Sequence, residues 1–390
     1  MREGWEYKKL GELVQVLNGY AFKSSLYENQ GIRVLRITNV QKGNIVDDDP
    51  KYYPLSLTDE IRNYLLKESD LLMSLTGNVG RVGLLTKEML PAALNQRVAC
   101  LRILSNGLNL GFLFHYLNSD KFEQDAVLSA KGIAQKNMST EWLKDYKLPL
   151  PPISVQQSIV SELDKINELI RLKKEQLKDY DNLAQSIFYE MFGDPVVNEK
   201  GWEVKKIGEV CLIERGGSPR PIKDYITEDE DGLNWIKIGD AQEGSIFINS
   251  TKEKIRKEGL KKTRMVHKGD FILSNSMSFG RPYIMGVDGC IHDGWLVLHD
   301  TNNTFNKLYL YYSLAHKSMY QQFKQMAVGG VVNNLNSEMV RRVLVLVPPL
   351  IVQQEFANRI ELIEMQKKQI ISTIQALETL LASRMQYWFD

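Results

Sequence analysis

The 390-residue sequence contains only three cysteines and no long uninterrupted run of apolar residues. Cys100, Cys211 and Cys290 lack the CxxC spacing of redox or metal sites, which favours a reducing compartment and buried, unpaired thiols. No apolar run approaches the roughly 18 residues that would span a bilayer. Residues 1–5 do not resemble a signal peptide, so we expect a cytoplasmic protein without a membrane segment.

Motifs for catalysis and metal binding are also missing. The five histidines show neither HxH nor HExxH spacing, which argues against a metal site. There is no Gly-Lys-Ser/Thr loop and no Asn/Asp-Pro-Pro-Tyr/Phe motif of amino-methyltransferases. Asp194 with residues 203–205 resembles a nuclease carboxylate set, but the repeated copy at residues 6–8 has no preceding aspartate. We therefore expect a non-catalytic chain that has no metal and no cofactor of its own.

An internal duplication is the most informative feature that is present. Residues 4–13 return as residues 201–210, and residues 151–157 return as residues 348–354, both with an offset of 197 residues. So long a period indicates duplicated domains and not a stacked solenoid. The predicted order is a globular domain at 1–150, a long helix at 151–193, a second globular domain at 194–347 and a second long helix at 348–390.

Each globular part reads as a β-rich domain of the α+β class. Alternating patterns predict strands at residues 32–40, 70–75 and 98–104 in the first copy and at residues 234–238, 270–274 and 295–298 in the second. Amphipathic patterns near the end of each copy predict one helix from residue 111 past residue 122, and one at residues 308–323.

The two long helices carry apolar residues at heptad spacing, which is typical of a coiled coil. Pro151 and Pro152 suit a helix entry, and Ser154 with Gln157 resembles a capping box. The predicted seam of the first helix is Ile159, Leu163, Ile166, Ile170, Leu177, Tyr180, Ala184, Ile187 and Met191. That of the second helix is Phe356, Ile360, Ile363, Ile370, Ile374, Leu377 and Leu381.

Each seam needs an apolar partner, so we expect the two helices to pack antiparallel on each other. The two domains would then lie at opposite ends of one spacer, related by an approximate twofold. Lys173 and Lys367 interrupt the seams as a pair, and we expect them to help fix the register of the coiled coil. Arg384 weakens the second seam near its end.

The whole chain resembles the specificity subunit of a type I restriction-modification system. The resemblance rests on the Gly-Trp-Glu start of each repeat, the Pro-Pro-hydrophobic-x-x-Gln-Gln helix entry, and the paired coiled-coil spacers. It implies that each globular part is a target recognition domain that reads one half of a bipartite, asymmetric DNA site. It also implies that the helices determine the gap between the half-sites.

The resemblance further implies partners that perform the chemistry. Two modification subunits would bind S-adenosylmethionine and methylate adenine, and restriction subunits with ATP-dependent translocase and nuclease activity would join them. S-adenosylmethionine, ATP and Mg are therefore expected in the partner subunits and not in this chain.

A basic run in the second copy is a candidate phosphate-binding surface, although charge is balanced overall at +1. It comprises Lys252, Lys254, Arg256, Lys257, Lys261, Lys262, Arg264 and Lys268. A solvated helix face is the alternative interpretation. The first copy has the acidic residues 47–49 in the equivalent region, so we expect its phosphate contacts from Lys23, Arg33 and Arg36.

Matched loops supply further candidates for DNA contact. The glycine-rich loops at residues 77–83 and 278–282 each carry an arginine, which a tight hairpin with a surface arginine would also explain. Residues 95–97 correspond to residues 292–294, where different side chains suit two different half-sites, or serve as turns before a strand. The loop at residues 216–221 resembles a family loop near DNA, and a rigid turn is its alternative. Polar, glycine-rich loops at residues 131–137 and 329–334 also match each other.

The predicted DNA-binding residues are Asn78, Arg81, Asn95, Gln96, Arg97, Lys131, Lys136, Arg220, Lys223, Lys257, Lys261, Lys262, Arg264, Arg281, His292, Asn333 and Asn334. Two rival functions are a coiled-coil scaffold that binds only proteins, and a self-contained restriction-modification enzyme. The enzyme would need a catalytic domain, for which two repeats in 390 residues leave no room.

Overall fold

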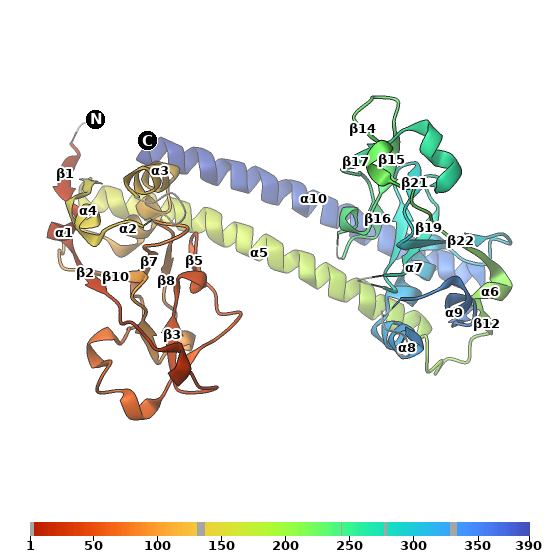
Figure 1. Cartoon of the computed structure of the whole chain (residues 1–390), viewed down its shortest axis with the longest axis horizontal. Coiled ribbons are helices and arrows are strands. Elements are labelled where there is room, and N and C mark those ends of the chain that lie inside the picture. The colour runs from red at the N-terminus through yellow and green to blue at the C-terminus, as the bar shows by residue number, and fades with distance from the viewer. Residues whose placement is uncertain (1–3, 131–136, 243, 277–278, 328–333) are drawn as a thin grey trace. The chain divides into compact units, whose positions relative to one another are not determined.

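The computed structural model describes residues 4–130, 137–242, 244–276, 279–327 and 334–390 (Figure 1). The chain forms two compact units, each built from a globular part and portions of both long helices. Unit 1 comprises residues 1–174 and 372–390, and unit 2 comprises residues 175–371. The mixture of helix and sheet, and the two long helices, confirm the predicted fold class.

The main sheet of unit 1 has the order β2-β10-β7-β8, with antiparallel neighbours (Figure 1). Its strands are β2 (Val14–Asn18), β7 (Leu71–Ser74), β8 (Val82–Leu84) and β10 (Val98–Ile103). Smaller sheets contain β1 (Glu6–Lys9), β3 (Ile32–Leu35), β4 (Val40–Gln41), β5 (Asn44–Ile45), β6 (Tyr52–Tyr53), β9 (Ala92–Leu94) and β11 (Lys147–Leu150). The short helices are α1 (Leu10–Leu13), α2 (Leu110–Leu117), α3 (Asp120–Ser129) and α4 (Thr140–Asp145).

Unit 2 repeats this plan in its main sheet, β13-β22-β19-β20-β16. These strands are β13 (Cys211–Arg215), β16 (Phe247–Ile248), β19 (Phe271–Ser274), β20 (Pro282–Met285) and β22 (Trp295–Asp300). A second sheet, β14-β17-β15-β21-β18, contains β14 (Ile226–Thr227), β15 (Leu233–Ile236), β17 (Glu253–Ile255), β18 (Arg264–Val266) and β21 (Gly289–Ile291). The remaining elements are β12 (Val204–Lys206), α6 (Ile207–Val210), α7 (Lys307–Ala315), α8 (Lys317–Ala327), α9 (Ser337–Arg341) and β23 (Leu344–Leu346).

The long helices are α5 (Ile153–Phe192) and α10 (Leu350–Phe389), each of 40 residues. In unit 1, Glu162 near the start of α5 accepts hydrogen bonds from Arg384 and Trp388 near the end of α10. In unit 2, Phe188 near the end of α5 packs on Phe356 near the start of α10, with ring centroids 5.6 Å apart. Early residues of one helix therefore meet late residues of the other within each unit, as expected for antiparallel packing.

The predicted seam residues are buried or half-buried along both helices. In unit 2, the fully buried Phe188 and Phe192 join the core of the globular part, beside the predicted Ile187 and Met191, which are only half-buried. The heptad pattern missed this pair because these phenylalanines pack on the domain and not only on the partner helix.

Lys367 of α10, which interrupts the apolar seam, forms ion pairs within unit 2. Its ammonium lies 2.7 Å from a carboxylate oxygen of Asp181 on α5 and 2.8 Å from one of Glu364, and its side chain is 13% exposed. Burial is the largest single influence and lowers the pKa of Lys367, but the hydrogen bonds that the ammonium donates to these two carboxylates, together with their charges, raise its pKa overall. Lys173 is half-buried on α5.

The predicted capping box at the entry of α5 is wrong. The helix begins at Ile153, and the carbonyl of Pro152 accepts from the amides of Val155 and Gln156. Ser154 is therefore already inside the first turn, where it is exposed. Two consecutive prolines fix the entry instead, because proline lacks the amide that the first turn leaves unpaired.

The first glutamine of the helix-entry motif, Gln156, makes the tertiary contacts, and not Gln157, which the sequence predicts to cap the helix. Gln156 is fully buried, accepts from the amide of Asn109 at 2.8 Å, and donates to the carbonyls of Gly107 and Pro151 at 2.8 Å. In unit 2, Gln353 makes the same three contacts with Asn306, Thr304 and Pro348. Each glutamine thus fastens a long helix to the loop that begins α2 or α7.

The prediction of one continuous helix near the end of each globular part is also wrong. In unit 1 the helix breaks at Ser119, whose hydroxyl caps α3 by accepting from the amide of Phe122. In unit 2 the break falls at His316, between α7 and α8. Ser119 competes for backbone hydrogen bonds, which favours a cap over a helix interior.

Candidate nucleic-acid interface

Four loop segments that are distant in sequence meet at one end of the main sheet in each unit. In unit 2, backbone bonds run from Gly216 to Trp295, from Asn275 to Gly294 and from Leu335 to Asn275, each at 2.9 Å. In unit 1, Leu75 bonds to Arg97 at 3.0 Å and Met138 bonds to Leu75 at 2.9 Å in the same way, whereas the first two segments are joined by a bond from Gln96 to Tyr20 at 2.9 Å. We call this region the loop edge. It comprises residues 19–20, 75–81, 95–97 and 137–138 of unit 1 and residues 216–220, 275–276, 279–281, 292–294 and 334–335 of unit 2.

Close backbone approach holds the loop edge together. A Cβ atom on Gly19 would lie 2.2 Å from the carbonyl oxygen of Asn95, and one on Gly216 would lie 2.3 Å from that of His292. Only glycine fits at such distances. In both units, therefore, a glycine allows the same close backbone contact between two of the candidate DNA-contacting segments.

The β7–β8 and β19–β20 hairpins contribute the candidate arginines. The carbonyl of Ser74 accepts from the amide of Gly80 at 2.9 Å, and the hydroxyl of Ser74 accepts from the amide of Arg81 at 3.1 Å. Ser274 makes the same two contacts with Gly280 and Arg281. The Arg81 guanidinium is half-buried and donates to the side chain of Gln41 at 2.7 Å. Sequence reasoning did not assign a role to the two serines, although they are the last residues of the matched strands β7 and β19.

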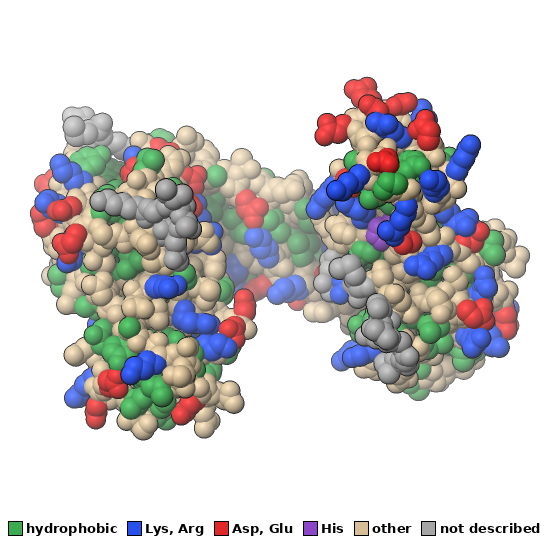
Figure 2. Space-filling view, viewed as in Figure 1, with side chains coloured by type: hydrophobic (Ala, Val, Ile, Leu, Met, Phe, Trp, Pro, Cys, Tyr) green, Lys and Arg blue, Asp and Glu red, His purple; other side chains and the backbone are tan. Residues whose placement is uncertain are grey.

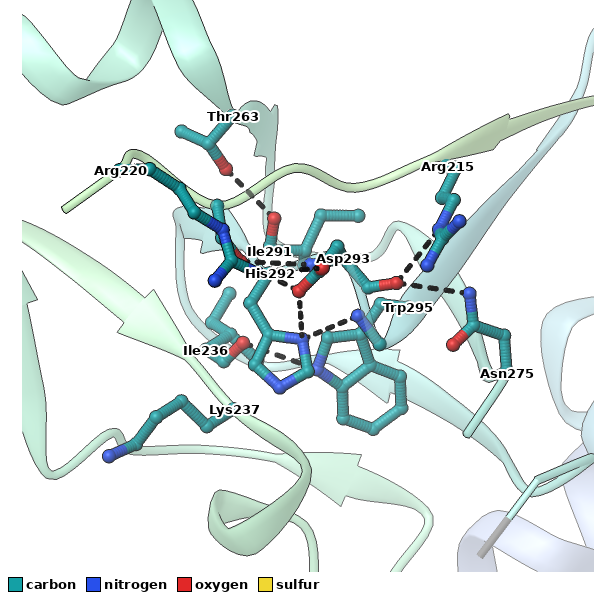
Figure 3. Close-up of polar contacts among 12 residues, drawn as sticks. Arg215, Arg220, Ile236, Lys237, Thr263, Asn275, Ile291, His292, Asp293 and Trp295 are labelled. Atoms are coloured by element: carbon teal, nitrogen blue, oxygen red, sulfur yellow. Dashed lines mark hydrogen bonds and ion pairs between the residues drawn. The ribbon is translucent and has the colours of Figure 1, made fainter. Parts of the chain in front are cut away.

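The turn at residues 292–294 lies at the centre of the unit 2 loop edge (Figure 3). The Asp293 carboxylate accepts from the hydroxyl of Ser218 at 2.7 Å and lies 3.6 Å from the guanidinium of Arg220. The hydrogen bond from Ser218 lowers the pKa of the Asp293 carboxyl below its usual value. The backbone carbonyl of Asp293 accepts from the side chains of Arg215 and Asn275. The Asp293 carboxylate is therefore held inside the turn, which does not favour a direct contact of this side chain with a base.

His292 is oriented by its own turn. Its Nδ1 accepts from the amide of Gly294 at 2.6 Å, and its backbone amide donates to the carbonyl of Ile236 at 3.3 Å. Burial lowers the pKa of His292 below its usual value, and the nearby charge of Lys237 acts in the same direction. Because Nδ1 accepts from a backbone amide, the neutral form of the ring carries its proton on Nε2.

The basic run of unit 2 spans β17, a 3-10 helix at Lys257–Lys262 and β18, so only its middle part is helical. Lysine and arginine side chains gather on this face, with acidic side chains among them (Figure 2). Lys257 pairs with Asp231 at 2.8 Å, and Arg264 pairs with Glu214 at 2.9 Å. Lys262 donates to the hydroxyl of Tyr225 at 2.8 Å. Lys223, Arg256 and Lys261 are exposed.

Unit 1 offers less positive charge, as the sequence suggests. Arg33 forms an ion pair with Asp47 at 2.6 Å, and Arg36 lies 3.4 Å from a carboxylate oxygen of Asp49. The acidic run thus compensates both arginines inside the unit, which does not favour the prediction that they contact phosphate. Lys23 is exposed.

Other predicted site residues are placed as follows. Asn78, Gln96 and Arg97 are exposed on the loop edge of unit 1, and Asn334 is exposed on that of unit 2. Lys131, Lys136 and Asn333 lie outside the described residues. Over the described ranges, no group of three or more His, Cys, Asp or Glu side chains could hold a metal ion. No helix in the part of the chain that the structure describes is long and apolar enough to cross a membrane.

The sequence matches one protein-family model twice, described as the type I restriction modification DNA specificity domain, over residues 2–179 and 199–378. A specificity subunit of the type I restriction enzyme EcoAI from Escherichia coli is 33% identical over 168 residues, covering 42% of this chain and 28% of that protein. The MjaVIII specificity subunit from Methanocaldococcus jannaschii is 29% identical, covering 47% and 44%. The chain thus spans less than half the length of these two relatives in the matched regions.

Other similarities extend over nearly the whole chain. The EcoBI specificity subunit from Escherichia coli is 22% identical over 93% of this chain and 79% of its own length. The S subunit of a type I restriction-modification system from M. genitalium has a TM-score of 0.56 at 14% identity, covering 99% of this chain and 96% of that one. A chain from a structural study of complex assembly in the type I R-M system has a TM-score of 0.64 at 18% identity, covering 100% and 98%. At these identities the two structures support the fold alone.

Proposed function

The chain belongs to the type I restriction-modification specificity subunits and carries their DNA specificity domain twice, and on this premise we propose that each unit reads one half of a bipartite DNA site. The chain itself is a non-catalytic subunit. The observation that carries the proposal is the loop edge, in which backbone bonds join the same segments in both units while the side chains that they present differ. A shared frame with different reading groups suits a site that is split and asymmetric.

We propose that α5 and α10 determine the gap between the two half-sites. Both helices are continuous for 40 residues, without an internal proline or glycine. A helix of that length is about 60 Å long. Such a stiff spacer favours one separation of the two reading units, whereas a flexible linker would allow many.

The chemistry is proposed for partner subunits in a complex that acts in the cytoplasm. Two modification subunits with S-adenosylmethionine would methylate adenine, and restriction subunits with ATP and Mg would translocate and cut DNA. The exposed flanks of the helices, and not their buried seams, are the surfaces that remain for docking. Leu169 and Leu172 of α5 and Leu362 and Met365 of α10 are exposed apolar residues on these flanks.

A selection experiment tests the DNA-reading function. The chain, assembled with its modification subunits, is incubated with duplexes of random sequence at moderate salt, and the retained duplexes are sequenced. We expect enrichment of two short defined segments separated by a gap of fixed length. Retention without any sequence enrichment would favour the rival protein-only scaffold, because phosphate contacts alone bind all sequences alike.

A further inference from the structure

The turns at residues 95–97 and 292–294 match at the level of single atoms, although their sequences differ. The amides of Asn95 and His292 donate to the carbonyls of Leu35 and Ile236, at 3.2 and 3.3 Å. Their carbonyls accept from Val98 at 2.9 Å and from Trp295 at 3.1 Å. The first residue of each turn is therefore held at both backbone polar groups in the same way.

The side chains of these two residues are also fixed in the same way. Oδ1 of Asn95 accepts from the amide of Arg97 at 3.2 Å, as Nδ1 of His292 accepts from the amide of Gly294 at 2.6 Å. In each case the acceptor atom of the side chain is used inside the turn. What remains is a nitrogen donor, Nδ2 of Asn95 or Nε2 of the neutral His292.

These donors are available to a ligand. Among the described residues, neither Nδ2 of Asn95 nor Nε2 of His292 has a hydrogen-bond partner. Asn95 is half-buried, and the His292 side chain is 21% exposed. Figure 3 shows Arg220 and Lys237 to the left of the imidazole, above and below it; Arg220 lies 3.6 Å from Asp293, and Lys237 pairs with Glu253.

We infer that Asn95 and His292 are equivalent specificity-determining residues, each donating one hydrogen bond to an acceptor on a base edge of its half-site. The inference rests on the proposed function. In the major groove, N7 and O6 of guanine, N7 of adenine and O4 of thymine are acceptors, whereas cytosine offers only its N4 donor. Each half-site therefore contains, at the position that the turn contacts, a base that is read through an acceptor.

Two aspartate substitutions test the inference, because they reverse the polarity of the presented atom. Asn95→Asp keeps the shape of the side chain and the oxygen that accepts from Arg97, but replaces the outward donor by an acceptor. His292→Asp also replaces the outward donor by an acceptor and keeps an atom that can accept from the amide of Gly294, but it does not keep the shape of the imidazole. His292→Asn is the conservative control, because it restores the side chain that unit 1 uses in the same turn.

The sites are determined by methylome sequencing of cells that express the complex with its modification subunits. We expect Asn95→Asp to lower the preference for one base in one half-site about tenfold or more, and His292→Asp to do so only in the other half-site. His292→Asn should retain the wild-type motif. The added negative charge would weaken binding to all four bases at a position alike. The comparison of the four bases at each position therefore separates this general loss of affinity from a change in base preference.

Unchanged base preference in both aspartate variants would overturn the inference, and so would changes spread over both half-sites. Loss of all sequence-specific methylation by the isosteric Asn95→Asp variant, with thermal unfolding unaltered, would also contradict it. The proposed function fails in a different way, because the wild-type complex would then yield no bipartite motif at all.

Discussion

At the scale of single residues, the two units differ mainly in the side chains that one shared backbone frame presents. Gly19 and Gly216 permit the same close approach, and Ser74 and Ser274 close the same hairpin. Asn95 and His292 then occupy one position with different shapes but the same hydrogen-bond polarity. The frame is an arrangement of backbone bonds, so reading groups can change without loss of the fold.

Gly294→Ala tests whether the orientation of His292 matters, because it leaves the imidazole in the sequence. A Cβ atom at this position would lie 2.1 Å from Cε1 of His292, so the ring must move. We expect weaker base preference at the same position as in His292→Asp, measured by methylome sequencing. Gly239→Ala is the control, because nothing lies within 4 Å of a Cβ there. An unaltered motif in Gly294→Ala would show that the ring orientation is not used.

Gln156→Leu tests the fastening of α5 to unit 1. The substitution removes the partner of the Asn109 amide and of the carbonyls of Gly107 and Pro151. A buried unpaired group costs roughly 1–3 kcal/mol, but water can replace the partner at the exposed Gly107. We expect the free energy of unfolding to fall by about 2–4 kcal/mol in denaturant titrations. Gln157→Leu, at the exposed neighbouring position, should change it by less than about 0.5 kcal/mol. Equal effects of the two variants would contradict the role of Gln156.

At the scale of elements, each long helix packs on the other long helix and is also bound to a globular part, by Gln156 in α5 and by Gln353 in α10. Phe389 at the end of α10 packs edge-on against Phe112 of α2, at a centroid distance of 5.8 Å, so the last turn completes the core of unit 1. In unit 2, the start of α10 enters the core through Phe356. A reading unit therefore consists of a globular part together with segments of both helices.

Lys367→Met tests the ion pairs inside the unit 2 seam. The substitution removes the contacts to Asp181 and Glu364 and leaves two carboxylates that water still reaches. We expect a loss of stability of about 1 kcal/mol, between the values of exposed and buried pairs. The matched control is Lys368→Met, on the exposed neighbouring position. If both variants unfold at the same denaturant concentration, the buried pairs contribute nothing.

The positions of the two long helices could be predicted from the sequence. The heptad spacing of Ile159 and Leu163, and the repeated Pro-Pro-x-x-x-Gln-Gln entry, signal two long helices because both patterns are local. The burial of Phe188 and the contacts of Gln156 could not be predicted, since they depend on loops brought close only by the fold. The internal pairing of Arg33 with Asp47 is missed for the same reason.

The loop edge shows the same division between local and long-range information. The internal repeat of the sequence is sufficient to identify Asn95 and His292, and likewise Gly80 and Gly280, as equivalent positions. It does not reveal that these turns meet residues 137–138 and 334–335, because no local pattern links segments so far apart. Nor does it reveal which atoms of Asn95 and His292 are used inside the turn and which remain for a ligand.

At the scale of the whole molecule, we expect the helices to determine the gap and the loop edges to determine the bases. Removing residues 174–180 from α5 together with residues 368–374 from α10 keeps both heptads in phase. It shortens each helix by about 10 Å. We expect the assembled complex to recognise the same two half-sites with a shorter gap, as read by methylome sequencing. An unchanged gap would refute the spacer role, and altered half-sites would refute the independence of the units.

The most direct test of the central claim is methylome sequencing of cells that express the wild-type chain with its modification subunits. We expect methylated adenines within one asymmetric motif, made of two defined segments at a fixed separation. Exchange of residues 20–145 for the first domain of another family member should then change one segment only. A single uninterrupted motif, or methylation without any motif, would contradict two units that each read half of a site.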